Sequence, residues 1–277
     1  AVFSLMDALM KGASLAVGAY SALLVRSAIG VLLAAPLWLA TRQAWPGRRA
    51  VRLHLVRGVV GAAMAFTFFW GIARLPLAEA IALSFVAPLA ALYLAAVLLG
   101  ETIARSAVIA SLLGVVGVAP IAGARMGSDV GHPEAGLGIA AVLASSLLYA
   151  WNLVLQRQQA LVARPAEVAA FQNAVVSLTL ALFAPWFLVV PGGEALGWTA
   201  AAAVLAVSGA MILSWAYRRA EAQALVPLEY SGFLWAALFG WLFFREALTV
   251  PTVAGAALIV AGCWIAAPKK RPEQTAA

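Results

Sequence analysis

Charged side chains inside apolar stretches are the residues of this chain with the greatest capacity for chemistry. Glu229 follows Pro227 within an apolar run, and a proline there leaves one backbone carbonyl without its usual amide partner. A carboxylate in such low-dielectric surroundings can take up a proton or hold a cationic group. The alternative is that Glu229 pairs with a basic residue or caps the backbone near one membrane surface.

A second polar set lies near the start of the chain. Ser4, Asp7, Lys11 and Ser14 have the three- and four-residue spacing that places side chains on one face of a helix. Asp7 and Lys11 can neutralise each other as an i, i+4 pair. Alternatively, Asp7 is the counter-ion of Arg26, and Lys11 then needs another partner. We expect this stripe to face a bundle interior, whether it serves coupling and substrate binding or only helix insertion.

Uncharged amides and hydroxyls gather on two later segments. They suit a polar solute that must be held weakly enough to leave, and they also serve as ordinary contacts between helices. Arg57, near the start of its own apolar segment, is expected to extend its side chain to the cytoplasm. The uncharged residues are Ser145, Tyr149, Asn152 and Gln156 on one segment and Gln172, Asn173 and Ser177 on the next.

Aromatic side chains form the remaining candidates for a binding site. Trp70 and Trp215 occupy equivalent positions of an internal repeat, so they either anchor the chain at opposite membrane surfaces or flank two gates. Tyr93 and Trp235 lie nearer the centres of their segments and can stack on a planar or cationic solute.

Composition restricts the elements that can position these residues. The 277 residues are 65% hydrophobic and 10% charged, whereas soluble domains carry about 25% charge. Continuous apolar runs of about 20 residues favour membrane-spanning helices over barrel strands. We therefore predict an all-α membrane protein with ten transmembrane helices. They are residues 2–17, 20–40, 53–73, 77–99, 106–124, 136–155, 167–190, 198–217, 224–244 and 250–267.

The distribution of basic residues predicts the orientation. Arginines follow the second segment, as in Arg48, Arg49 and Arg52, and further basic residues follow the sixth and eighth segments and lie in the tail. The positive-inside rule then places both termini in the cytoplasm, which we take to be that of a bacterial-type cell with the chain in its inner membrane. This explains the net charge of +7 without nucleic acid as a partner. Because the sequence lacks an initial methionine, we expect it to start within the first helix.

The chain contains an internal repeat. WGIARLPLAEAIALSFVAPLAALYLAAVLLGE, residues 70–101, aligns with WAYRRAEAQALVPLEYSGFLWAALFGWLFFRE, residues 215–246. The alignment pairs Trp70 with Trp215 and Glu101 with Glu246. Five helices per half make the second repeat enter the membrane in the opposite sense, and such duplicated units are typical of secondary transporters.

These repeated segments resemble the drug/metabolite transporter superfamily, in its EamA-type branch. The resemblance implies ten helices as two inverted five-helix repeats around a central cavity, with the fifth and tenth helices as an outer scaffold. The sequence departs from the pattern where Arg245 aligns with Gly100 and Phe233 with Pro88. The expected divisions are a first repeat at 1–125, an extracytoplasmic linker at 126–135, a second repeat at 136–268 and a basic cytoplasmic tail at 269–277.

The sequence holds no catalytic or metal-binding motif, and we expect neither an enzyme nor a cofactor. The prediction is a secondary transporter that moves a small polar metabolite, such as an amino acid or a nucleotide-like or vitamin-like solute, by alternating access. Proton coupling is an option through Glu229 and Asp7, and the sequence leaves open a monomer or a homodimer. A flippase for lipids or lipid-linked sugars and an accessory membrane subunit remain the alternatives.

Overall fold

The computed structural model describes residues 1–41, 45–87, 90, 109, 112–113, 116–121, 134–217 and 222–266. Within these ranges, the side chains at 157, 160–161, 214, 216–217, 222–231, 263 and 266 also lie outside the description. Every regular element in the described part of the chain is a helix. The helices are α1 (Val2–Ala40), α2 (Arg48–Ile72), α3 (Leu77–Ser84), α6 (Ala135–Val162), α7 (Pro165–Ala181), α8 (Ala184–Phe187), α9 (Gly193–Tyr217), α10 (Ala222–Phe244) and α11 (Val250–Ala266).

Apolar composition and length make several of these helices suitable for crossing a membrane. Among the described residues, α1, α2 and long parts of α6 and α9 each satisfy both requirements, and α10 and α11 contain shorter apolar helical stretches. Many large apolar side chains are exposed, such as Leu32, Trp186 and Val190. An apolar surface of this extent requires lipid as its solvent.

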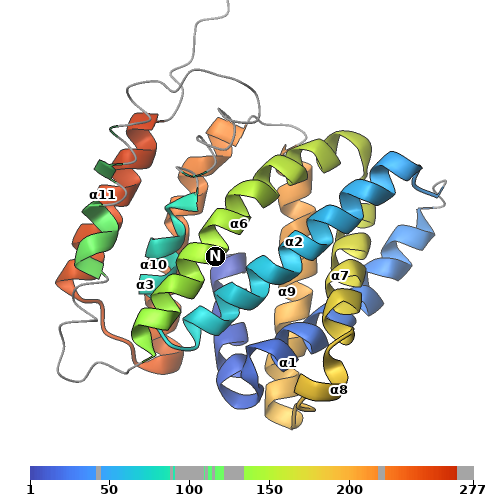
Figure 1. Cartoon of the computed structure of the whole chain (residues 1–277), viewed down its shortest axis with the longest axis horizontal. Coiled ribbons are helices and arrows are strands. Elements are labelled where there is room, and N and C mark those ends of the chain that lie inside the picture. Colours follow the sequence, from blue (N-terminus) through green and yellow to red (C-terminus); the bar gives the residue numbers. More distant parts are fainter. Residues whose placement is uncertain are drawn as a thin grey trace, which may run out of the picture.

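Helix α1 joins the first two predicted segments, which meet at Gly18. This residue has φ 80° and ψ 150°, a conformation that glycine adopts without the steric penalty of a Cβ atom. The helix direction changes sharply there, and the two arms of α1 diverge from this bend (Figure 1). The predicted boundary between residues 17 and 20 is therefore confirmed.

The seventh predicted segment, residues 167–190, is split in the structure, so its single span was wrong. Helix α7 ends at Ala181, and the short α8 carries Pro185 in its first turn. Proline has no amide hydrogen to continue a helix and clashes with the carbonyl four residues earlier, here that of Ala181. The backbone beyond α8 is held by α1 instead, because Ser21 Oγ accepts a hydrogen bond of 2.9 Å from Val189 N and donates one of 3.3 Å to Phe187 O.

The two halves of the chain interdigitate rather than forming separate bundles. Helix α1 packs against α9 and α7, α2 packs against α6 and α7, and α3 packs against α10 and α11. Figure 1 shows α3, α10 and α11 on one side of the molecule and the longer helices on the other. Side chains from both halves close the core, among them Met10, Leu23, Ile72, Val142 and Ile259. Any site in the interior is therefore built from both halves.

The two ends of the bundle differ in charge. We call the end with Arg48, Arg49 and Arg52, where α2 begins, the basic face. The other end, which holds the turns at residues 73–76 and 245–249, is the opposite face. These two turns meet, since Leu77 N donates a 2.8 Å hydrogen bond to Glu246 Oε2.

Helix α10 ends at the opposite face with a residue in the left-handed conformation. Arg245 has φ 56°, and its amide donates to Trp241 O at 3.0 Å while the Glu246 amide donates to Gly240 O at 3.2 Å. This is the αL type of helix ending, which glycine usually supplies. Gly100 occupies the aligned position of the first repeat, so the substitution that distinguishes the repeats falls where an arginine raises the conformational energy.

Close backbone packing brings α11 against residues 116–121. A Cβ atom on Gly117 would lie 2.7 Å from Gly255 O, and one on Gly255 would lie 2.6 Å from Ile121 Cγ1. Both separations are too short for a side chain, so only glycine permits this approach.

We predict that Arg245→Gly stabilises the protein by about 1 kcal/mol, because it removes the cost of a left-handed non-glycine residue. The measurement is the thermal unfolding midpoint in detergent. Arg245→Ala is the matched control, since it removes the guanidinium, which lies 5.6 Å from the Trp241 ring, and keeps the Cβ atom. A stabilisation by alanine equal to that by glycine would contradict the backbone explanation.

We predict that Gly255→Leu destabilises the protein by about 1 to 3 kcal/mol, the usual cost of overpacking. Gly197→Leu on α9 is its control, because a Cβ atom there meets nothing within 4 Å. In the control, higher helix propensity should leave the stability unchanged or raise it slightly. Equal losses in both variants would show that α11 does not depend on close glycine packing.

Candidate functional site

The polar stripe on the first arm of α1 faces the bundle interior, as predicted. Ser4, Asp7, Lys11 and Ser14 are all buried, and Ser4 Oγ donates a 3.1 Å hydrogen bond to Gly232 O on α10. The stripe therefore lies between the two halves of the chain.

The predicted pair between Asp7 and Lys11 is wrong, because no ion pair forms between them. Asp7 interacts electrostatically with Arg26 on the second arm of α1, as the alternative prediction stated. Arg26 Nη1 lies 3.6 Å from Met6 Sδ, and its guanidinium carbon lies 5.6 Å from the Phe69 ring centroid. Within the described residues, Arg26 Nε is buried without a hydrogen-bond partner. Asp7 and Arg26 thus form a loosely satisfied pair of opposite charges.

Lys11 instead pairs with Glu246 at the end of α10. Its Nζ also donates to Leu75 O, and the second carboxylate oxygen of Glu246 accepts the Leu77 amide at 2.8 Å. The Lys11 ammonium lies 5.2 Å from the Phe244 ring centroid. We call Lys11, Leu75, Leu77 and Glu246 the opposite-face latch, because they tie α1, α3 and α10 together at that end of the bundle.

A buried network joins α2, α6 and α7 in the half of the bundle nearer the basic face. Arg57 Nε donates to Asn152 Oδ1 at 3.2 Å, and Arg57 Nη1 donates to Gln159 Oε1. Gln159 Nε2 bonds to His54 Nδ1, and His54 Nε2 lies 2.9 Å from Glu167 Oε1. We call these five residues the α2–α6–α7 network.

The hydrogen bonds of this network have one consistent direction. Arg57 can only donate, so its partner must be the oxygen of Gln159. The Gln159 nitrogen is then left to face His54. His54 Nδ1 must then be the acceptor, and its Nε2 carries the hydrogen that is donated to Glu167. The arrangement therefore specifies the neutral Nε2–H tautomer and a polarised chain from guanidinium to carboxylate.

The surroundings of the network are aromatic and closed. Phe171 stacks on the His54 ring with 4.5 Å between centroids, and it contacts Trp38 edge-on at 5.1 Å. His54 and Gln159 are both fully buried. The network is thus enclosed by protein and aromatic side chains.

Several predicted substrate-binding residues belong to this network or lie near it. Asn152 is a member, and Tyr149 on the same helix interacts electrostatically with Arg57. Gln172 packs on Gly61 of α2, and its Oε1 is buried with no hydrogen-bond partner in the described part of the chain. Asn173 is buried and donates to Ala169 O at 2.9 Å. These four residues remain predictions as solute contacts.

The predicted aromatic walls are placed differently. Trp70 lies at the opposite-face end of α2, where the Arg74 guanidinium sits 3.4 Å from its ring centroid and the Arg74 Nε lies 2.8 Å from Glu134 Oε2. Trp215 is 54% exposed and Trp235 39%, so both lie at the surface that lipid covers. Tyr93 lies outside the described residues, as does the side chain of Glu229.

Sequence reasoning missed four members of the network. Arg57 was expected to reach the cytoplasm, and that prediction is wrong, since the side chain is 8% exposed and bonded to α6. His54 and Arg57 are three residues apart on one helix face, which was the available signal. Gln159 and Glu167 gave no such signal. Gln159 lies beyond the end of the predicted segment 136–155, and Glu167 lies at the start of the predicted segment 167–190.

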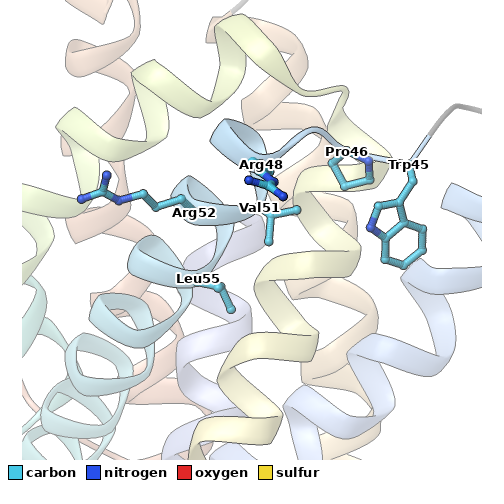
Figure 2. A pocket seen from close by; sticks show the side chains of 6 residues that line it. All are labelled: Trp45, Pro46, Arg48, Val51, Arg52 and Leu55. Carbon is cyan, nitrogen blue, oxygen red and sulfur yellow. The ribbon is translucent and has the colours of Figure 1, made fainter.

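Two open pockets lie outside the network. One, of about 400 Å³, is at the basic face and is lined by Trp45, Pro46, Arg48, Val51, Arg52 and Leu55 (Figure 2). The other, of about 690 Å³, opens beside the latch among the ends of α1, α9 and α10 and includes Leu15, Trp198, Phe243 and Phe244. Neither pocket holds a predicted solute-binding residue. No group of His, Cys, Asp and Glu suited to a metal ion occurs in the part of the chain searched.

The arrangement has counterparts among known proteins. The chain is 32% identical to a pseudopaline exporter of Pseudomonas aeruginosa over 94% of this chain and 90% of that protein. It is 31% identical to an uncharacterized transporter of Helicobacter pylori, over 76% of this chain and 72% of the other. A solved crystal structure with 26% sequence identity superposes with a TM-score of 0.63, covering 96% of this chain and 94% of that one.

A family model matches both halves, at residues 1–123 and 136–267. The family has a ten-helix fold and its relatives are transporters, so this chain is an all-α, multi-pass membrane transporter and not an enzyme. The resemblance seen in the repeated segments is thereby confirmed. The chain belongs to the EamA-like transporter family.

Proposed function

We propose that this protein is a secondary transporter that exports a small polar solute by alternating access between its two five-helix halves. One observation carries the proposal: polar and charged groups from both halves gather inside a bundle whose outer surface is apolar. Several of their atoms, including Ser14 Oγ, Ser27 Oγ and Gln172 Oε1, have no hydrogen-bond partner among the described residues. Each unpaired buried group costs about 1 to 3 kcal/mol, and a polar solute would supply the missing partners.

The packing of the helices supports an inverted repeat. Equivalent helices are related by exchanging the halves, so that the first arm of α1 corresponds to α6 and α2 corresponds to α9. Helix α1 packs on α9 as α2 packs on α6, and α3 packs on its own equivalent, α10. This reciprocal pattern is expected when two inverted repeats face each other around a shared centre.

The opposite-face latch is suited to act as a gate in this cycle. It joins the first arm of α1 to the ends of α3 and α10, and it must break for a path to open there. With the basic face placed in the cytoplasm, the latch closes the external side. Release to that side then requires the Lys11 and Glu246 charges to separate.

The direction and the solute are taken from the relatives. The name pseudopaline exporter supports export and makes pseudopaline the first compound to test, beside amino acids, nucleosides, riboflavin, S-adenosylmethionine and carboxylates. A lipid substrate is the second candidate, because the 690 Å³ pocket beside the latch has apolar, exposed lining residues such as Leu15 and Phe243. Proton coupling through Asp7 or Glu229, and the choice of monomer or homodimer, remain predictions.

We predict that breaking the latch exposes the interior from the opposite face. The reporter is Ser27→Cys, placed at a fully buried position of α1 in a chain whose single cysteine, Cys263, is replaced by serine. Glu246→Gln removes one charge of a partly buried pair, at a cost of about 1 to 2 kcal/mol, and should raise the reaction rate with a membrane-impermeant thiol reagent roughly tenfold.

Leu32→Cys is the matched control for this labelling. Leu32 lies on the same helix and is 73% exposed on the apolar surface, so an aqueous reagent should not modify it in either background. If the Ser27→Cys reporter is unreactive both in the parent chain and in Glu246→Gln, the result counts against alternating access. It would then favour an accessory subunit.

We predict that reversing the latch charges, with Lys11→Glu and Glu246→Lys together, does not restore a closed opposite face. The backbone contributes fixed partners to the latch, because Leu75 offers a carbonyl to residue 11 and Leu77 offers an amide to residue 246. Both would face groups of the wrong polarity after the reversal. Labelling of the Ser27→Cys reporter at the rate of the parent chain would refute this role for the backbone.

A further inference from the structure

We propose that Arg57 is the subsite for an anionic group of the transported solute, a carboxylate or a phosphate. This inference rests on the proposed transport function and names the chemical class that the interior recognises. Arg57 lines neither the pocket at the basic face nor the pocket beside the latch.

Arg57 differs from the other interior cations in its partners. Three lysine and arginine side chains lie inside the bundle in the described part of the chain. Lys11 has the carboxylate of Glu246, and Arg26 interacts with Asp7. Among the described residues, the hydrogen bonds of Arg57 go to neutral groups, the amide oxygens of Asn152 and Gln159, and Tyr149 interacts with it electrostatically.

The nearest acidic residue in the network is already engaged. Glu167 accepts the hydrogen of His54 Nε2, and it is separated from Arg57 by both His54 and Gln159. Burying an ion without a counter-charge costs several kcal/mol, so the site is favourable for any anion that can reach it. A neutral solute would leave this charge uncompensated.

The guanidinium is also oriented in advance. Two amide oxygens on α6 hold Nε and Nη1, which fixes the plane of the group. A planar fork of donors held in this way matches a carboxylate or phosphate better than a lysine ammonium would. An anion bound through Nη2, or in place of one amide oxygen, would give the guanidinium the counter-charge that the two amides do not supply.

Neighbouring groups complete such a site. Tyr149 lies one turn before Asn152 on α6 and interacts electrostatically with Arg57, so it is part of the surroundings that an anion at Arg57 would meet. Gly58 and Gly61 keep the α2 backbone close to α7, where Val175 and Gln172 pack against them. The Gln172 amide thus approaches α2 one turn beyond Arg57 and offers hydrogen bonds to uncharged parts of a solute.

The test compares anions with an uncharged analogue on purified protein. Thermal midpoints are measured with sodium succinate, sodium phosphate or succinamide at constant ionic strength. We expect an anion at about ten times its dissociation constant to raise the midpoint by about 3 °C or more, and succinamide to leave it unchanged. Stabilisation by succinate alone indicates a carboxylate solute, and stabilisation by phosphate alone a phosphorylated one.

The variants identify the residue. Arg57→Gln should abolish the shift, Arg57→Lys should retain a smaller one, and Arg52→Gln, an exposed position on the same helix, should keep the full shift. A full shift in Arg57→Gln overturns the inference. The absence of any anion effect on the parent protein also overturns it. Labelling of the Ser27→Cys reporter tests the transport function separately.

A second measurement needs no variant and covers the case in which Arg57→Gln does not fold. The parent protein is treated with phenylglyoxal, which modifies arginine, and modification of the Arg57 peptide is followed by mass spectrometry. Protection by succinate or phosphate, at least fivefold greater than by succinamide, supports the subsite. Equal modification with all three compounds, or none at all, shows that anions do not occupy Arg57.

Discussion

The cost of placing charge in a low-dielectric interior is the constraint on which the rest of this structure depends. The Lys11 ammonium is compensated by the Glu246 carboxylate, and the Glu167 carboxylate accepts a hydrogen bond from the neutral His54 ring. Each of these pairs joins helices that are distant in sequence. An ion pair and a hydrogen bond to a carboxylate therefore hold the two halves of the chain together at defined points, while the apolar exterior is free to face lipid.

This constraint also explains why two ends of one bundle differ. At the opposite face, the latch uses two charges together with a backbone carbonyl and a backbone amide from the segment that begins α3. Nearer the basic face, the network uses one cation, two neutral amides, an imidazole and a carboxylate. The latch is compact, because its contacts join only three short stretches of chain. The network distributes one guanidinium charge over a longer polarised chain.

Backbone chemistry sets the places where the helices can end or bend. Gly18 permits the reversal within α1, and Pro185 ends the continuous helix that hydropathy predicts over residues 167–190. Arg245 has a left-handed conformation directly before Glu246. The helix ending therefore places the Glu246 carboxylate beside Lys11. Conformation and charge are thus coupled at the proposed gate.

The sequence by itself determined the solvent, the helical class, the repeat and the family. These follow from composition, from the length of apolar runs and from the alignment of residues 70–101 with 215–246, all of which are local or additive properties. The inward orientation of the α1 stripe was also predictable, because helical spacing alone fixes which side chains share a face.

Only the tertiary structure decided the partners. Lys11 has a potential partner four residues away, yet it pairs with Glu246, since the ends of α3 and α10 bring backbone groups that complete that contact. Arg57 could have extended to water, but packing of α2 against α6 and α7 encloses it with Asn152 and Gln159. Sequence spacing specifies the face on which a side chain lies, whereas its partner depends on long-range packing, which spacing does not encode.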